Sequence, residues 1–460
     1  MTKLGIIILA AGLGKRMKSP LPKVAHKLCG KPLIKYSIET AASLNPEICS
    51  VVLGYKNEIL KPIIPEGVKI AIQEEQLGTG HAVMQAAGDF SGFDGKILVL
   101  CGDVPMLKSS TLKKLLSYYD NQSAEAVVLT TEIENPAGYG RIVRKEDNSV
   151  AGIVEEKDAD KETKLIKEIN SGIYCFDSKL LFKYLPQIKN SNSQSEYYLT
   201  DIISLMVEKK HKVCALKIKD NIEVEGINDR LQLSRLEKET YRINARTHLE
   251  KGVVISDIEN TYIDCDAKIG AETVINPGSR IHYAAIGRNC IVNGTEIENC
   301  EIKDNVVIGR SRINGCIILS NVEIGNFNDI SFSEIKQNSK IGSSNVLSNS
   351  KFGQNTTIQN NCSLEDIESG KDCIYSNNSA MCSFDGLNRH KSAIGDEVFI
   401  GAGCVIASPV KIGDSSYITS SSAIINDVSE NCLVMSRPET IVKQGYFEKL
   451  KKKLEPSEVK

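Results

Sequence analysis

The sequence predicts two folded regions: an α/β domain with a mostly parallel sheet, then a solenoid of short stacked strands. In residues 1–228, short apolar runs alternate with amphipathic stretches, which is typical of parallel strands covered by helices. Beyond residue 251, pairs of an aliphatic residue and a glycine recur, with further aliphatic residues at steps of about six. At 460 residues the chain is too long for one ordinary core, so two or three domains are expected from length alone.

Composition excludes several classes of protein. The formal net charge of −2 argues against a general nucleic-acid or membrane surface. The 14 cysteines are scattered without a CxxC pair or a Cys/His metal spacing, so we expect reduced thiols. No run of about 18 apolar residues occurs, and the N-terminal apolar run leads into basic residues instead of a cleavage site. We therefore expect a cytoplasmic protein without membrane insertion.

The first element is an apolar run at residues 4–9, which predicts a buried parallel strand. The chain then turns through Gly12 and Gly14, and glycine lets backbone N–H groups approach phosphate oxygens. Arg16 and Lys23 follow and add the positive charge that phosphate requires. Taken alone, this turn is equally compatible with a tight strand-to-helix connection.

Later predicted strands also end in polar residues, at the edge where parallel sheets bind ligands. A strand at 68–72 is followed by Gln73, Gly78 and Thr79, which can approach and recognise a base edge or form a plain loop. A strand at 97–101 is followed by Asp103, either a Mg²⁺ ligand or a turn residue. Further predicted strands span 48–53 and 126–130.

The string LAAGLGKRM with LPK at 21–23 resembles the opening signature of the sugar-1-phosphate nucleotidyltransferases. Further motifs extend the resemblance over roughly residues 4–250: GYGR at 138–141, VEEK at 154–157, EINSG at 168–172, EYYLTD at 196–201 and EVEGIN at 223–228. In this order they resemble the N-terminal, Rossmann-like domain of the bifunctional N-acetylglucosamine-1-phosphate uridylyltransferase/glucosamine-1-phosphate acetyltransferase family. Cys101 is a departure, because the family usually has tyrosine there.

The resemblance implies roles at the matching positions. The residues implied to bind the uridine nucleotide are Leu9, Ala10, Ala11, Gly12, Lys23, Gln73, Gly78 and Thr79. Those implied to hold the N-acetylglucosamine moiety are Gly140, Glu155 and Asn170, and those implied to hold Mg²⁺ are Asp103 and Asn228. Arg16, Lys23 and Asp103 would carry the catalysis.

The implied reaction is uridylyl transfer. The phosphate oxygen of N-acetylglucosamine 1-phosphate attacks the α-phosphorus of UTP in line, and pyrophosphate leaves. Positioning and charge neutralisation then carry the rate without a side-chain nucleophile. The product, UDP-N-acetylglucosamine, is a precursor of the peptidoglycan and lipopolysaccharide of the cell envelope.

The second half begins with helical spacing at 229–251, which predicts a connecting helix. The six-residue repeat then covers 252–446, and residues 447–460 form a tail. By resemblance the repeat is a left-handed parallel β-helix with an acetyltransferase site, and the family forms trimers. A homotrimer is therefore expected, with acetyl-CoA as a co-substrate only if the second activity is retained.

The acetyltransferase motifs are degenerate. An ungapped reading from 325 to 353 places Ser343 at the family's general base, Val346 at its tyrosine, and Ser331 and Ile313 at its phosphate-binding cations. An unperturbed serine hydroxyl cannot serve as the base near neutral pH. The base could instead be displaced to His390, in a stretch that resembles the family's extended loop.

Ala402 and Arg437 match positions at which the family binds acetyl-CoA. A structural explanation accounts for them at least as well: Ala402 as a small residue facing into the coil, and Arg437 as a solvated surface residue. The sequence therefore leaves three functions open. The first is uridylyl transfer alone, and the second is the full bifunctional enzyme. The third is a nucleotidyltransferase for another hexose 1-phosphate with a non-catalytic scaffold.

Overall fold

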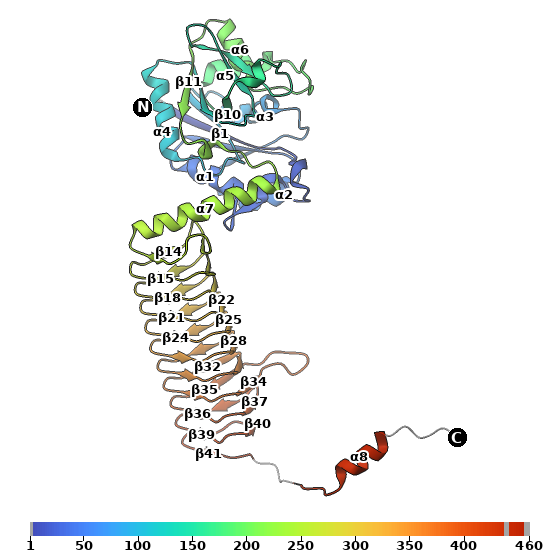
Figure 1. The fold of residues 1–460 in the computed structure, drawn as a ribbon, viewed down its shortest axis with the longest axis vertical. Coiled ribbons are helices and arrows are strands. Elements are labelled where there is room, and N and C mark those ends of the chain that lie inside the picture. The colour runs from blue at the N-terminus through green and yellow to red at the C-terminus, as the bar shows by residue number, and fades with distance from the viewer. Residues whose placement is uncertain (1–2, 437–440, 455–460) are drawn as a thin grey trace, which may run out of the picture. The chain divides into compact units, whose positions relative to one another are not determined.

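The computed structural model describes residues 3–436 and 441–454, and the chain forms two compact units, Met1–Glu239 and Thr240–Lys460 (Figure 1). The division lies inside one helix, α7 (Arg230–Glu250). Within the described ranges no helix is long and apolar enough to cross a membrane.

The first unit contains a nine-stranded sheet in the order β11-β7-β10-β6-β1-β4-β5, in which β8 also pairs with β10 and β9 pairs with β8. Its strands are β1 (Lys3–Ala10), β4 (Ile48–Leu53), β5 (Lys69–Ile72), β6 (Gly95–Cys101), β7 (Ala126–Glu132), β8 (Arg141–Arg144), β9 (Val150–Val154), β10 (Glu168–Asp177) and β11 (Val213–Ile218). The pairs β6–β1, β1–β4, β4–β5 and β7–β11 are parallel. The predicted mostly parallel sheet is confirmed, whereas β10, antiparallel to both β6 and β7, is a feature the sequence analysis missed.

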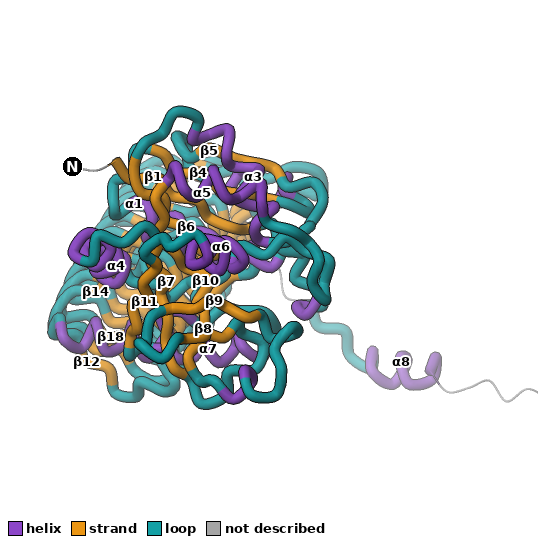
Figure 2. The backbone as a smooth tube through the Cα atoms, turned by 90° about the horizontal axis from the view of Figure 1, so that it is seen from above, coloured by secondary structure: helices purple, strands orange, loops and turns teal. Residues whose placement is uncertain are grey.

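Helices cover both faces of this sheet (Figure 2). The α-helices are α1 (Leu33–Ala42), α2 (Asn57–Leu60), α3 (Thr79–Ala86), α4 (Ser109–Asn121), α5 (Ser178–Tyr184) and α6 (Thr200–Glu208). Because successive strand residues face opposite ways, Ile7 packs with α3, α5 and α6, while Ile6 and Ile8 pack with α1 and α4.

Short elements connect these layers. They are the hairpin β2 (Lys27–Leu28) and β3 (Lys31–Pro32), and the 3₁₀ helices η1 (Lys15–Met17), η2 (Lys23–Ala25), η3 (Lys61–Ile63), η4 (Ala87–Phe90), η5 (Thr163–Leu165), η6 (Leu185–Gln187) and η7 (Asn221–Val224). Elements η1 and η2 are the first two elements after β1, and they contain the basic residues Lys15, Arg16 and Lys23.

The second unit is a parallel β-helix with three faces. The first face comprises β12 (Val254–Ile255), β15 (Val274–Ile275), β18 (Ile291–Val292), β21 (Val307–Ile308), β24 (Glu323–Ile324), β27 (Lys340–Ile341), β30 (Thr357–Ile358), β33 (Ile374–Tyr375), β36 (Phe399–Ile400), β39 (Tyr417–Ile418) and β41 (Leu433–Val434). The second comprises β13 (Tyr262–Ile263), β16 (Arg280–His282), β19 (Glu296–Glu298), β22 (Arg312–Asn314), β25 (Asp329–Ser331), β28 (Val346–Ser348), β31 (Ser363–Glu365), β34 (Ala380–Cys382), β37 (Val405–Ala407) and β40 (Ala423–Ile424). The third comprises β14 (Lys268–Ile269), β17 (Ala285–Ile286), β20 (Glu301–Ile302), β23 (Ile317–Ile318), β26 (Glu334–Ile335), β29 (Lys351–Phe352), β32 (Ile367–Ser369), β35 (Ser392–Ile394) and β38 (Lys411–Ile412).

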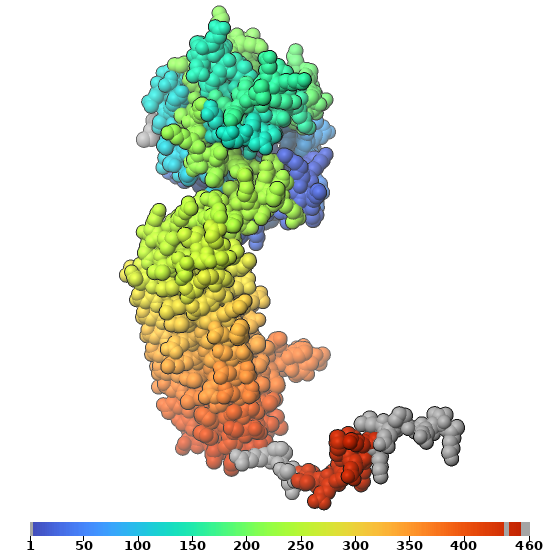
Figure 3. Space-filling model, in the orientation of Figure 1, coloured from blue at the N-terminus to red at the C-terminus, as the bar shows by residue number. Residues whose placement is uncertain are grey.

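The repeat produces this shape because each short strand turns one aliphatic side chain inward. Ile308, Ile324 and Ile341 stack in register and are almost completely buried. One coil differs from its neighbours: residues 383–391 leave the stack between β34 and β35 and form the protrusion visible in Figure 3. A final helix, α8 (Tyr446–Leu454), follows the coils.

Candidate active site

The carboxyl ends of the central strands are joined by backbone hydrogen bonds. Gly102 N, after β6, donates to Leu9 O in β1 over 2.8 Å, and Gln73 N, after β5, donates to Leu53 O in β4 over 2.8 Å. Ile227 N donates to Asp103 O over 3.0 Å. This network brings the loops after β1, β5 and β6 and the segment before α7 to one edge of the sheet.

A cluster of three charged and polar side chains lies at this edge. The Lys23 ammonium on η2 forms an ion pair with Asp103 Oδ2 and also donates to Asn228 Oδ1 over 3.2 Å. The side chains of Lys23 and Asp103 are only 16% and 18% exposed, so the pair is largely shielded from water. Oxygens from two distant segments therefore converge on one cationic group.

The glycine turn lies against this cluster. Gly14 has φ +61°, and a Cβ built on it would stand 2.7 Å from Lys23 Cβ, so the left-handed glycine permits a close approach. A Cβ on Gly12 would meet nothing within 4 Å, and Arg16 in η1 is exposed. The turn therefore presents open backbone and a cation next to Lys23, whereas Ala10 and Ala11 are buried at the end of the strand.

The segment after β5 is tightly organised. Gln73 is 3% exposed, and its Nε2 lies 3.1 Å from Gly78 O and 3.0 Å from His81 Nδ1. Gly78 has φ +108°, and a Cβ there would come within 2.6 Å of Tyr197 O. Thr79 Oγ1 accepts from Leu199 N over 3.0 Å, so this loop is packed against the segment before α6.

A second polar group lies between β8, β9 and β10. Asn170 N donates to Gly140 O over 2.9 Å, and a Cβ on Gly140 would stand 3.4 Å from Glu155 Oε2. Burial raises the pKa of Glu155 above its ordinary value, although the hydroxyl of Thr200, which donates to Glu155 Oε1 over 3.1 Å, opposes that rise. The three predicted sugar-binding positions are therefore adjacent in the structure.

Two supporting residues were missed by sequence reasoning. Tyr174 Oη accepts from Asn170 Nδ2 over 2.7 Å and fixes the amide, and Thr200 holds Glu155. Thr200 belongs to the EYYLTD motif and could have been found there, but Tyr174 carries no motif signal. The departure at Cys101 is accommodated because its thiol donates to Gly172 O over 3.4 Å, and burial raises the pKa of Cys101 to about 12.

In the second unit, Ser343 lies at a corner of the coil and belongs to a ladder, a row of side-chain oxygens that each accept a backbone N–H from the preceding coil. Its Oγ accepts from Asn326 N over 3.1 Å, and its own N–H donates to Asn360 Oδ1 over 2.7 Å. Ile313 is completely buried in the solenoid core, whereas Val346 is 45% exposed and Ser331 ends strand β25. None of these four residues carries the charge or the basic ring that the acetyltransferase match would need.

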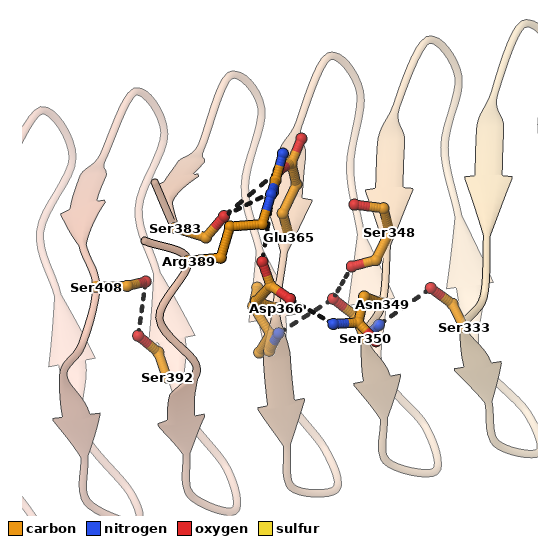
Figure 4. Close-up of polar contacts among 11 residues, drawn as sticks. Ser333, Ser348, Asn349, Ser350, Glu365, Asp366, Ser383, Arg389, Ser392 and Ser408 are labelled. Carbon is orange, nitrogen blue, oxygen red and sulfur yellow. Dashed lines mark hydrogen bonds and ion pairs between the residues drawn. The ribbon is translucent and has the colours of Figure 1, made fainter. Parts of the chain in front are cut away.

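The protruding loop 383–391 is attached to the preceding coil, which contains β31 (Figure 4). Arg389 pairs with Glu365 over 2.6 Å and with Asp366 over 3.5 Å, and Asp366 also accepts from Asn349. Within the loop, His390 Nε2 lies 2.7 Å from Asp385 Oδ2. Three backbone and side-chain donors, of which Asn388 N is the strongest, lower the pKa of Asp385.

The acetyl-CoA positions are only partly covered by the structure. Ala402 is half-buried, and its carbonyl accepts from Ser421 N over 2.8 Å, as expected for a corner of the coil. Arg437 lies outside the described residues.

Comparisons with known proteins identify the family of this chain. The family model described as nucleotidyl transferase matches residues 6–229. A relative from Caldanaerobacter subterraneus subsp. tengcongensis, named bifunctional protein GlmU, is 40% identical over 456 residues, covering 98% of this chain and 99% of the relative. Proteins of the same name from Listeria monocytogenes serotype 4a and Brevibacillus brevis are each 38% identical, with the same coverage.

The chain belongs to the bifunctional GlmU family. It is accordingly an enzyme, a nucleotidyltransferase that forms UDP-N-acetylglucosamine from nucleotide and sugar phosphate substrates. The family also implies a divalent metal. A solved UDP-glucose pyrophosphorylase complexed with UDP-glucose aligns with 53% of this chain and 100% of its own at a TM-score of 0.44 and 20% identity, too low to bear on function.

Proposed function

We propose that the first unit transfers uridylyl from UTP to N-acetylglucosamine 1-phosphate and that Lys23, Asp103 and Asn228 form the reacting end of its site. The observation that carries this assignment is the convergence of Asp103 Oδ2 and Asn228 Oδ1 on the Lys23 ammonium. Nucleotidyl transfer needs a cation held by oxygens next to a phosphate-binding turn, and the turn at 12–16 is adjacent.

The donor set fits Mg²⁺. This ion prefers one or two protein oxygens plus substrate phosphates and water, and a carboxylate with an amide oxygen provides that number. In the described part of the chain no cluster of three or more His, Cys, Asp or Glu side chains competes as a metal site. When bound by Asp103 and Asn228, Mg²⁺ would neutralise phosphate charge and polarise the α-phosphoryl group.

The chain's own residues supply the rest of the chemistry. The open backbone around Gly12 and the Arg16 guanidinium would bind the triphosphate, and Lys23 would neutralise charge on the phosphates. Gln73, Gly78 and Thr79 would hold the uridine base in a loop whose shape is fixed by internal hydrogen bonds. The sugar phosphate is itself the nucleophile, so orientation and charge neutralisation carry the rate.

Selection of the acetamido sugar would rest on the second polar group. Glu155 and Asn170 are held by Thr200 and Tyr174, and the absence of a side chain at Gly140 leaves room beside them. A rigid carboxyl and amide pair discriminates sugars because an unsatisfied buried polar group is costly.

The test measures pyrophosphate release from UTP and Mg²⁺ with N-acetylglucosamine 1-phosphate or with glucose 1-phosphate. We expect kcat/KM to be at least about 100-fold higher with the acetamido sugar. Equal values would favour the alternative of another hexose 1-phosphate, and the absence of turnover with either sugar would contradict the assignment.

A second candidate function is acetyl transfer from acetyl-CoA to glucosamine 1-phosphate by the solenoid. One observation favours it: the Asp385 carboxylate orients His390, as a general base requires. Against it, Ser343 is a rung of a hydrogen-bonded ladder and Ile313 is a core residue.

Release of free CoA thiol with and without glucosamine 1-phosphate decides between the two functions, with a blank for the protein's 14 cysteines. Sugar-dependent release that is lost in His390→Gln would establish the second activity and its base. No release from a sample that turns over UTP would leave the chain dependent on a separate enzyme that acetylates the amino sugar.

The arrangement of domains is also a proposal. We assign uridylyl transfer to 1–228, a connecting helix to 229–251, the β-helix to 252–446 and a tail to 447–460, with the β-helix assembling a homotrimer. Comparing the mass in solution of the whole chain with that of residues 1–251 tests the assembly role. A trimeric 1–251 fragment would contradict it.

A further inference from the structure

The position of Lys23 has a consequence beyond phosphate binding. Its ammonium lies between the two oxygens that the proposed function assigns to the metal, one on the loop after β6 and one before α7. These oxygens come from positions 80 and 205 residues away from Lys23 in sequence. A single cation therefore already holds together the two halves of the proposed metal site.

The same oxygens cannot serve Lys23 and a divalent cation together. Mg²⁺ needs its oxygens at about 2.0–2.1 Å and in near-ideal octahedral directions. An ammonium that donates to Asp103 Oδ2 and Asn228 Oδ1 occupies the same directions, and two cations that close repel each other strongly in a shielded site.

Hydrogen bonds that do not involve Lys23 hold the two segments that carry these oxygens. Asn228 Nδ2 donates to Gly226 O over 3.4 Å, and Asn228 N donates to Gln232 Oε1 over 2.7 Å. The side-chain amide is therefore held through its nitrogen, and its oxygen faces Lys23. Asp103 is fixed through its carbonyl, which accepts from Ile227 N. Removal of Lys23 from the pair therefore leaves the Asn228 amide and the backbone of Asp103 in place.

A second position for the ammonium lies nearby. Lys23 Cβ would be 2.7 Å from a Cβ on Gly14, so the base of the side chain rests on the glycine turn. Phosphate oxygens bound to this turn lie within reach of a flexible four-carbon stem, and they would compensate the ammonium for the loss of Asp103.

We infer that Lys23 is a positioning residue that occupies the metal site in the absence of nucleotide and couples metal binding to nucleotide binding. This inference rests on the proposed function. Without nucleotide, Lys23 competes with the divalent cation for Asp103 and Asn228. With nucleotide, the phosphates take over the ammonium and the two oxygens pass to the metal, so the metal binds tightly only together with the nucleotide.

The test measures Mn²⁺ binding to the full chain by electron paramagnetic resonance and calorimetry, with and without UTP. We expect Lys23→Met, which keeps the aliphatic stem, to bind Mn²⁺ without nucleotide roughly tenfold or more tightly than the wild type. It should also lose most of the increase in Mn²⁺ affinity that UTP causes in the wild type. Lys113→Met, which removes an exposed cation from α4, should bind Mn²⁺ as the wild type does.

Asp103→Asn distinguishes a failure of the metal assignment from a failure of the proposed competition between Lys23 and the metal. If Asp103→Asn binds Mn²⁺ as well as the wild type, the metal assignment in the proposed function is wrong. If Asp103→Asn loses Mn²⁺ while Lys23→Met and Lys23→Gln, both folded by circular dichroism, bind it no more tightly than the wild type, the metal site stands and the competition is overturned.

Discussion

The two units use the same polar residue types in opposite ways. In the first unit, Asp103 in the loop after β6 and Asn228 in the segment before α7 converge on the side chain of Lys23. In the second unit, Ser343 and Asn360 sit at corners of the coil, where their side-chain oxygens accept backbone N–H groups of the preceding coil.

The difference teaches that the hydrogen bonding of the local backbone decides which role remains for a polar side chain. A β-helix corner has backbone donors at every coil, and buried donors must be satisfied, so corner residues become structural. At the end of a parallel sheet the backbone groups bond one another, as Gly102 N does with Leu9 O, and the Asp103 carboxylate pairs with the side chain of Lys23. Four substitutions sharpen or break this comparison.

The largest effect is expected for Asp103→Ala. Loss of a carboxylate that would hold the metal and that now pairs with Lys23 should lower uridylyl transfer by about 10³-fold or more, measured by pyrophosphate release. The control is Asp94→Ala, which removes an exposed partner of Lys179 and should leave the rate unchanged. Wild-type turnover of Asp103→Ala would remove this residue from the site.

A large effect on stability alone is expected for Asn328→Ala in the solenoid. Its side chain is buried, with Nδ2 donating to Gly325 O and Gly342 O over 2.9 Å each and Oδ1 accepting from Asn345 N over 2.9 Å. Leaving these groups unsatisfied should lower the free energy of unfolding of this unit by about 3 kcal/mol, measured by urea denaturation.

The control is Glu323→Ala in the same unit, which removes an exposed side chain 4.0 Å from Lys340 and should cost about 0.5 kcal/mol or less. Uridylyl transfer should be unchanged in both variants. Equal losses of stability, or a lower rate of transfer, would contradict the structural role assigned to the corner residues.

Glu155→Gln should stabilise the folded protein and weaken binding of the sugar phosphate. Because burial raises the pKa of Glu155 in the folded state, its carboxyl favours folding only in the neutral form, and this contribution is lost as the pH rises through the folded pKa. The glutamine variant should therefore unfold at a higher urea concentration than the wild type at pH 8, with the advantage shrinking toward pH 4.5.

The same variant should raise KM for the sugar phosphate about tenfold or more, because the anionic acceptor is lost. Exposed Glu162→Gln is the control for both measurements. An unchanged KM would exclude Glu155 from sugar binding, whereas a loss of stability at pH 8 would contradict the raised pKa.

The smallest effect is expected for His282→Gln at the start of the solenoid. The pKa of His282 is raised mainly by its hydrogen bond to Asp264, at 3.0 Å, and further by Glu298 and Glu296, while burial opposes the rise. This contribution to stability is complete below about pH 6.5 and is lost as the pH rises through the folded pKa.

His282→Gln should therefore destabilise the second unit by about 1 kcal/mol at pH 5.5 and by less at pH 9, measured by urea denaturation at both pH values. A loss that grows with pH would show that the pair with Asp264 does not stabilise the protonated ring.

The sequence by itself determined the elements whose signal is local. Burial on a strand or a coil repeats at a fixed spacing, so the strands β1, β4, β5, β6 and β7 and the stacked aliphatics of the solenoid were predicted within a few residues. The motifs also pointed to the strand ends where Gln73 and Asp103 lie, and to Asn170 within β10.

Only the tertiary structure decided which side chains meet. The antiparallel pairing of β10 with β8 brings Asn170 to Gly140, and chain segments 205 residues apart bring Asn228 to Lys23. The corner ladder made Ser343 a structural residue, although the sequence offered it as a position in a catalytic site. Spacing along a chain carries information about burial, whereas a site consists of long-range contacts that form only when the whole fold closes.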